Sequence, residues 1–210
     1  MEIVADRMLA GIRDNSSSSI NISGSGGFTK RGSGRLYFNR TRYSTCNYTG
    51  PTTILGGGIV VTNSVFKPGR GELALSEGTF LDLNGFDVEF CGATGAGIIT
   101  NGAETASVLT LGYGNTDSSF MAAVGERISV VKTGTGTLTV SGAALANACD
   151  FTIEGGTVVF AGNSSSYGTV MVKSGTVLDI SGCEFSCAGI VKEPGGTVLR
   201  PKKGFVMSFR

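Results

Sequence analysis

Three acidic residues that lie close together in the sequence are the best candidates for contact with a ligand: Asp82, Asp87 and Glu89. Carboxylates can hold a cation or bind sugar hydroxyl groups, and pairs of them catalyse glycoside hydrolysis. A polysaccharide lyase or hydrolase needs several such groups clustered with Lys or Arg. We therefore interpret these residues first as solvated surface, then as contacts for a sugar or a cation, and we assign no catalytic residue.

The residue types that are missing exclude much other chemistry. The chain contains no His, so a Ser-His-Asp triad, a Cys-His pair and a His-ligated metal site cannot form. Its five cysteines are Cys46, Cys91, Cys149, Cys183 and Cys187, and none forms a Cys-x-x-Cys pair. We expect no metal and no cofactor. Most cysteines should be buried apolar side chains, with a Cys183–Cys187 disulfide as the alternative.

The charge balance gives no reason to expect nucleic acid. The 17 basic residues nearly cancel the 16 acidic ones. A local basic group is interleaved with aromatic residues, and we interpret it as loop and edge charges rather than a site for an anionic glycan or nucleic acid. This group contains Lys30, Arg31, Arg35, Arg40 and Arg42, with Tyr37, Phe38 and Tyr43. No apolar run approaches the ~18 residues of a membrane-spanning helix. The charged start of the chain does not resemble a signal peptide.

A short repeat indicates a coiled β architecture. The chain has 34 Gly, about twice the usual share of roughly 7%. The triplet Gly-Thr-apolar recurs at intervals of 20, 19 and 21 residues, beginning at Gly136, Gly156, Gly175 and Gly196. A period near 20 with a strand after each turn fits one coil of a parallel β-helix.

A longer repeat divides the chain into two units of roughly 100 residues, about 27–128 and 129–210. The segment at Lys30 matches the segment at Lys132 with an offset of 102 residues, and Ile54 matches Ile153 with an offset of 99. Asp82 matches Asp179 with an offset of 97. A position that recurs in both units is better explained by the fold than by an active site, because a site needs to exist only once.

These patterns predict an all-β fold with a single β-helix domain over residues 20–210. Residues 1–13 place their apolar side chains on one helical face, so we expect a short capping helix within an N-terminal cap and linker of residues 1–19. Alternating residues should form the core while Asp82, Thr139 and Asp179 should be exposed. The predicted core residues are Leu36, Phe38, Leu81, Leu83, Leu138, Val140, Phe151, Ile153, Leu178 and Ile180.

The same segments resemble the autotransporter-associated β-strand repeat. The run from Lys132 to Gly142 fits the Lys-x-Gly-x-Gly-x-Leu pattern of that family, and Asn47 to Thr53 resembles its Asn-x-Tyr-x-Gly-x-Thr pattern. The segments Leu81–Phe86 and Leu109–Gly112 extend the resemblance, which spans roughly residues 27–200. The resemblance implies a right-handed parallel β-helix that is exported and displayed at the cell surface.

We therefore expect a non-catalytic structural or adhesive surface module of the autotransporter-passenger type. Two alternatives stay open: a subunit of a fibre or phage-like appendage, and a carbohydrate-active β-helix that acts as a lyase or hydrolase. The expected partners are a surface glycan, a protein or a further copy of the chain. We expect the chain to be at the cell surface or secreted, although it shows no signal peptide.

Overall fold

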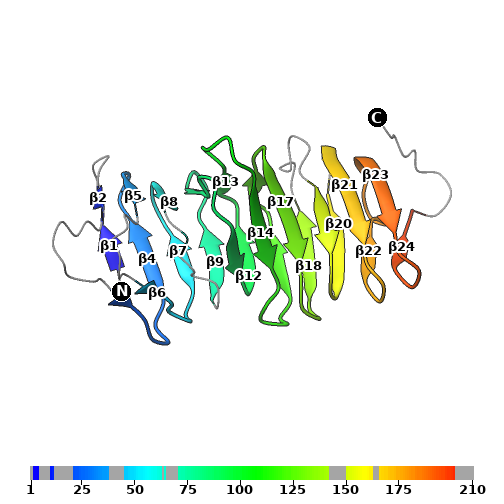
Figure 1. The fold of residues 1–210 in the computed structure, drawn as a ribbon, viewed down its shortest axis with the longest axis horizontal. Helices are drawn as coiled ribbons and strands as arrows, with labels where there is room; N and C mark the ends of the chain where they lie inside the picture. Colours follow the sequence, from blue (N-terminus) through cyan, green and yellow to red (C-terminus); the bar gives the residue numbers. More distant parts are fainter. Residues whose placement is uncertain are drawn as a thin grey trace.

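The computed structural model of this chain is a parallel β-solenoid, in which short strands stack along one long axis (Figure 1). It describes residues 2–4, 10–11, 21–37, 45–62, 64, 71–141, 150–162 and 166–201. Within these ranges the regular elements are all strands, and every strand pairing is parallel. The predicted all-β, parallel coiled architecture is therefore confirmed.

One sheet, here called the long sheet, runs from end to end of the described chain and contains ten strands. Its strands, in order, are β1 (Glu2–Val4), β4 (Phe28–Arg31), β7 (Thr52–Ile54), β9 (Glu72–Leu75), β12 (Gly92–Gly95), β15 (Ser118–Phe120), β18 (Thr137–Ser141), β20 (Thr157–Ala161), β22 (Val177–Asp179) and β24 (Thr197–Leu199).

Two six-stranded sheets form further faces of the solenoid. The N-terminal sheet contains β2 (Ala10–Gly11), β5 (Arg35–Tyr37), β8 (Gly58–Val60), β10 (Phe80–Asp82), β13 (Ile98–Thr100) and β16 (Ala123–Val124). The C-terminal sheet contains β11 (Val88–Phe90), β14 (Ser107–Leu111), β17 (Ile128–Lys132), β19 (Phe151–Ile153), β21 (Ser166–Val172) and β23 (Ser186–Lys192). A separate pair joins β3 (Asn21–Ile22) to β6 (Thr45–Cys46).

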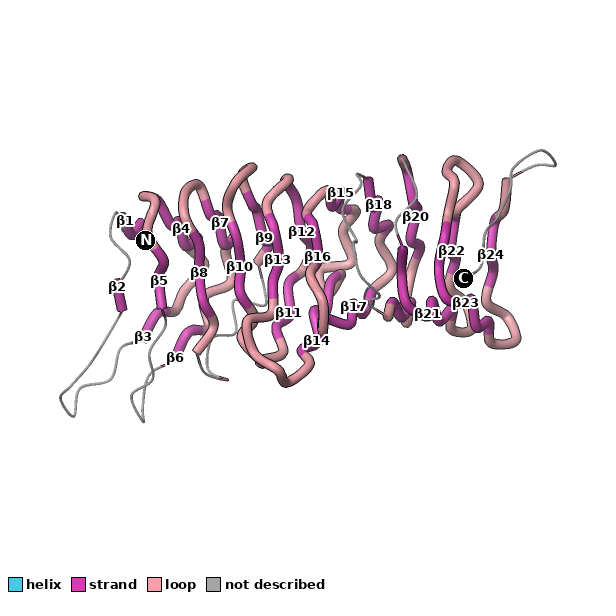
Figure 2. The backbone as a smooth tube through the Cα atoms, turned by 90° about the horizontal axis from the view of Figure 1, so that it is seen from above, coloured by secondary structure: helices cyan, strands magenta, loops and turns pink. Residues whose placement is uncertain are grey.

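The shape of a coil changes along the solenoid (Figure 2). From β10 to β18 the chain visits the N-terminal, C-terminal and long sheets in turn, so these coils have three strand-bearing faces. From β17 to β24 the strands alternate between the C-terminal and long sheets only. The described C-terminal coils therefore have two strand-bearing faces.

The core lies inside the coils, where alternate residues of each strand point inward. In β18, Leu138 and Val140 are buried while their neighbours are half-buried, the period-two pattern of a strand with one face on a core. Nine of the ten predicted core residues are buried, and Phe38 lies outside the described residues. Asp82, Thr139 and Asp179 lie on the outer faces but are half-buried, and not exposed as predicted.

Glycine has two different roles at the corners between sheets. Gly134 has φ +68°, in the left-handed region where a side chain is strained. Gly156 and Gly175 have the same conformation. Gly136 differs: its φ is not positive, but an added Cβ would collide with the backbone of Thr116 in the preceding coil. Close stacking of coils is therefore the reason for glycine at that position.

The predicted N-terminal helix is wrong at the residues that the structure describes. Glu2–Val4 is strand β1, which pairs with Thr29–Arg31, and β2 pairs with Leu36 and Tyr37. An extended chain here satisfies the backbone groups along the edges of β4 and β5, which a helix would leave unpaired. Two β-branched residues, Ile3 and Val4, also favour a strand. The remainder of the predicted helix lies outside the described residues.

The matched segments of the two sequence units fall in different sheets. Lys30 is the last buried residue of β4 in the long sheet, whereas its counterpart Lys132 is in β17 of the C-terminal sheet. Leu81 is in the N-terminal sheet, and its counterpart Leu178 is in the long sheet. The second set of segments is thus displaced by one face around the solenoid relative to the first.

Candidate functional site

The three acidic candidates do not form one site. Asp82 lies at the end of β10 in the N-terminal sheet, whereas Asp87 and Glu89 lie at β11 in the C-terminal sheet. Asp82 Oδ1 accepts hydrogen bonds from the backbone N–H of Asn84 at 3.0 Å and of Gly102 at 2.8 Å. Asp87 Oδ1 accepts from the backbone N–H of Val108 at 2.7 Å. Both aspartates therefore join one coil to the next.

Coil-to-coil bonds of this kind recur along the described chain. Asn115, Asp117 and Asp150 accept backbone N–H groups that lie 19 or 20 residues later, over distances of 2.7–3.0 Å. Where the pairing with the preceding strand ends, a backbone N–H needs an acceptor from outside the strand ladder, and a side-chain oxygen of the preceding coil supplies it. The acidic side chains at these positions thus have a structural role.

The repeated pair Asp82 and Asp179 has a shared explanation. Asp179 Oδ1 accepts from the backbone N–H of Ser181 at 2.9 Å, as Asp82 does from Asn84. In each case an aspartate closes a turn on the residue two positions later, which is a common turn-forming contact. The recurrence of aspartate therefore follows from the local turn.

Asp87 and Glu89 line an open groove of about 480 Å³. The groove is lined by Ser64, Gly85, Phe86, Asp87, Val88, Glu89 and Thr110. Glu89 is exposed and stacks in register on Thr110, so a carboxylate and a hydroxyl group face solvent side by side. In the part of the chain that the structure describes, no group of three acidic or Cys side chains could hold a metal ion. Contact with a sugar or a cation in this groove stays a prediction.

Two lysines are buried, which corrects the interpretation of Lys30 as a loop or edge charge. Lys30 and Lys132 are 0% and 1% exposed, and each ammonium group donates to three backbone carbonyl groups at a corner. Lys30 Nζ donates to the carbonyl oxygens of Arg31, Gly32 and Gly56 at 2.6, 2.8 and 3.0 Å.

Lys132 makes the same contacts in the second unit. Its Nζ donates to the carbonyl oxygens of Thr133, Gly134 and Gly155 at 2.6, 3.1 and 3.2 Å. Burial lowers the pKa of Lys132, and nearby Asp117 opposes that shift. The first Lys of the Lys-x-Gly-x-Gly pattern therefore ties a tight corner to the next coil. The recurrence of this lysine in both units was the only feature of the sequence that pointed to this role.

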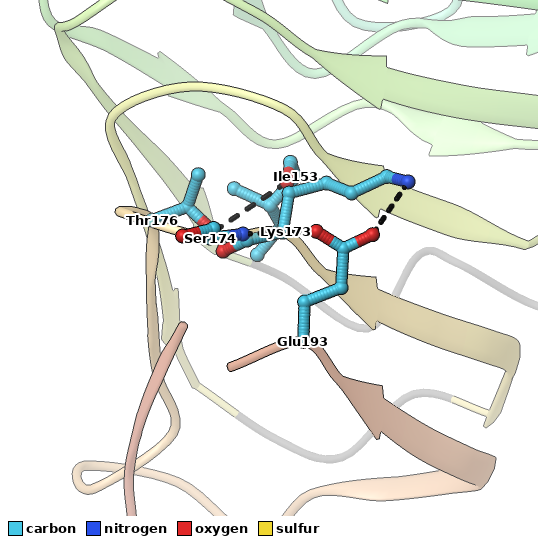
Figure 3. A network of polar contacts seen from close by, with 5 residues as sticks. All are labelled: Ile153, Lys173, Ser174, Thr176 and Glu193. Carbon is cyan, nitrogen blue, oxygen red and sulfur yellow. Dashed lines mark hydrogen bonds and ion pairs between the residues drawn. The ribbon is translucent and has the colours of Figure 1, made fainter. Parts of the chain in front are cut away.

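A surface ion pair joins two corners near the end of the described chain (Figure 3). Lys173 Nζ lies 2.8 Å from Glu193 Oε1, and Glu193 Oε2 accepts from the backbone N–H of Ser174. This contact raises the pKa of Lys173 and lowers the pKa of Glu193. Thr176 donates inside the same corner to the carbonyl oxygen of Lys173 at 2.8 Å. These contacts of Lys173, Ser174, Thr176 and Glu193 all join parts of the same chain. They therefore stabilise the corner.

The described cysteines are free thiols, so no Cys183–Cys187 disulfide is present. Cys46, Cys183 and Cys187 are buried, as predicted, and Cys91 is half-buried. Burial raises the pKa of each of these thiols, to about 12 for Cys46. A thiol held in its protonated form is a poor nucleophile and a poor metal ligand. Cys149 lies outside the described residues.

Comparison with known proteins yields a similarity to an adhesin. Over 138 residues, 64% of its length, the chain is 31% identical to the protein named Adhesin BmaC autotransporter of Brucella suis biovar 1 (strain 1330). The matched stretch is 4% of the length of that protein. No family model and no solved structure matches the chain. The similarity and the parallel β-solenoid are consistent with an autotransporter-type β-helix. Among the described residues, no helix is long and apolar enough to cross a membrane.

Proposed function

We propose that this chain is a non-catalytic adhesive module displayed at the cell surface, built as a right-handed β-helix of the autotransporter-passenger type. The observation that carries the proposal is the 31% identity to an autotransporter adhesin, together with the parallel solenoid fold of this chain. Right-handed coiling is the rule for crossovers between parallel strands. A stack of coils presents long flat faces, and repeat proteins use such extended surfaces for binding.

The contacts of the acidic side chains support a non-catalytic function. A general acid or base must be free to reach a substrate proton. Asp82 and Asp87 instead accept backbone N–H groups of the following coil, over 2.8 and 2.7 Å. Asp82 also belongs to a different sheet from Asp87 and Glu89, and only those two line the same groove.

Adhesion can be measured with beads coated with the purified chain and washed over arrays of immobilised glycans and matrix proteins. Retention on a defined subset of the array is the expected result. The control is the chain with Leu138→Asp, which buries a charge in the core and should unfold the solenoid. Equal retention of both samples would contradict adhesion by the folded module.

A second assay separates adhesion from catalysis. The chain is incubated with common polysaccharides, and release of reducing or unsaturated ends is followed. We expect no turnover. Turnover that disappears in Asp82→Asn or Asp87→Asn, while Asp150→Asn keeps it, would replace the adhesive proposal with a carbohydrate-active enzyme. Asp150 is the matched control because it makes the same coil-to-coil bond in another part of the solenoid.

A further inference from the structure

The outer face of the N-terminal sheet carries a row of side chains that the adhesive proposal does not explain. The row crosses five strands in register and consists of Arg35, Gly58, Phe80, Ile98 and Ala123. The next residue of each strand is buried in the core, so the row itself lies on the outside.

Phe80 and Arg35 form a stacked pair on this face. An added Cβ at Gly58 would collide with the ring of Phe80, which shows that the ring lies across the sheet over the glycine. The guanidinium carbon of Arg35 lies 5.1 Å from the centre of that ring. This is the geometry of a cation–π contact, which holds the arginine in place without neutralising its charge.

Further apolar side chains are exposed on the coils that this row crosses. Ile98 is 44% exposed and is the register neighbour of Phe80. Leu55 and Met121 are 41% and 49% exposed, and both lie at the corner where the chain passes from the long sheet to the N-terminal sheet. These are three of the six large apolar side chains that are exposed in the described chain. Together, Arg35, Leu55, Phe80, Ile98 and Met121 are called the corner patch.

The positive charge of the corner patch has no ion-pair partner among the carboxylates that the structure describes. In the described part of the chain no carboxylate lies within ion-pair distance of Arg35, whereas neighbouring Arg31 is 3.1 Å from Glu2. Asp82 lies one row away on the same face, but its Oδ1 accepts two backbone N–H groups. Among the described residues, the positive charge of Arg35 is therefore left for a ligand to neutralise.

We propose that the corner patch docks a protein segment that carries a carboxylate next to an apolar side chain. This inference rests on the proposed adhesive function and names the class of its partner. Exposed apolar surface with a polar rim marks interaction sites, and Met, aromatic residues and Arg are enriched in protein interfaces. An acidic glycan would satisfy Arg35 but leave three aliphatic or thioether side chains without a matching surface, so the observations favour protein.

The test uses the full chain and short synthetic peptides in which Glu alternates with Leu or Phe, with binding followed by fluorescence anisotropy. Ile98→Asp places a negative charge in the apolar part of the patch, and Arg35→Glu reverses its positive charge. Each should weaken binding about tenfold or more. Peptides with Lys in place of Glu should not bind.

Val191→Asp is the matched control, because Val191 is an outward β-branched residue that is 50% exposed in the C-terminal sheet. It should keep the wild-type affinity, and thermal unfolding checks that all variants are folded. Equal losses in Ile98→Asp and Val191→Asp would overturn the assignment. Absence of peptide binding, with oligogalacturonate bound through Arg35, would make the partner an acidic glycan. A dimer that Ile98→Asp dissociates, without peptide binding, would make it a second copy of the chain.

The bead assay separates this inference from the adhesive function on which it rests. Beads coated with Ile98→Asp should lose retention on the protein spots of the array. If they are retained as well as wild-type beads, adhesion stands and the corner patch is not its docking surface. If wild-type beads are not retained anywhere but the peptides bind, the docking surface stands and the adhesive function fails.

Discussion

Replacing Lys132 by Met tests whether a buried ammonium group holds the solenoid corners together. Met fills nearly the same volume but donates no hydrogen bond, so the carbonyl groups of Thr133, Gly134 and Gly155 lose their shared donor. Leaving a buried acceptor unpaired costs about 1 kcal/mol or more, so three acceptors should cost about 3 kcal/mol. The variant no longer buries a charge, and this gain offsets part of the loss. We therefore expect a net loss in the free energy of unfolding of at least about 2 kcal/mol.

Urea denaturation followed by circular dichroism measures this free energy of unfolding. Lys30→Met should lose a similar amount, because its ammonium group makes the equivalent contacts. Lys173→Met is the control, since that lysine forms only an exposed ion pair and its loss should leave the midpoint unchanged. A loss below about 0.5 kcal/mol in both buried variants would refute the reasoning and show that water satisfies these carbonyl groups equally well.

The remaining predictions concern the core, the corners, the thiols and pH. Leu138→Ala should lower the free energy of unfolding by about 2–5 kcal/mol, because the side chain is fully buried; a loss below about 0.5 kcal/mol would show that the core register is wrong. Gly134→Ala should destabilise more than Gly175→Ala in thermal melts, since both glycines have positive φ but only Gly134 has backbone in the way of a Cβ. Equal melting temperatures of the two variants would show that contact between the added Cβ and neighbouring backbone does not contribute to the destabilisation. Cys46 should resist alkylation by iodoacetamide at pH 8 until urea is added, as mass spectrometry of its peptide can show; burial raises its pKa to about 12. Between the lowered pKa of Lys132 and its ordinary value of 10.5, the unfolded chain binds more protons, so this group makes stability rise with pH. The stability gap between wild type and Lys132→Met should therefore widen in that range, and a gap that narrows would contradict a lowered pKa.

The repeat and the alternation of residues were enough to predict the class of fold and nearly all of the named core. Strands of a solenoid have a simple signature, because a glycine corner and an inward-facing apolar pair recur in every coil. The N-terminus was mispredicted because a short apolar segment satisfies both the helical and the extended period. Pairing with the edge of β4 decided in favour of the strand, and that edge is a property of the folded coils.

The candidate site was harder to predict, because the pairing of strands from different coils decides which residues lie next to one another. Asp82, Asp87 and Glu89 are close in sequence, yet a corner of the solenoid separates the first from the other two. Arg35 and Phe80 are 45 residues apart, and only the stacking of β5, β8 and β10 brings them together. The buried lysines were visible as a repeated residue, but one of the three carbonyl groups that each contacts belongs to the following coil and carries no sequence signal.

The one-face displacement between the two units has a consequence for how such chains can diversify. In an ordinary solenoid a duplicated segment returns to the same side, so duplicated surface residues line up into one stripe. Here the counterparts of the segments at Lys30 and Leu81 point in new directions, because Lys132 and Leu178 belong to different sheets from their counterparts. Duplication of this unit therefore places equivalent surfaces on successive faces of the solenoid. Each copy has different neighbours, and a partner would reach it from a different side.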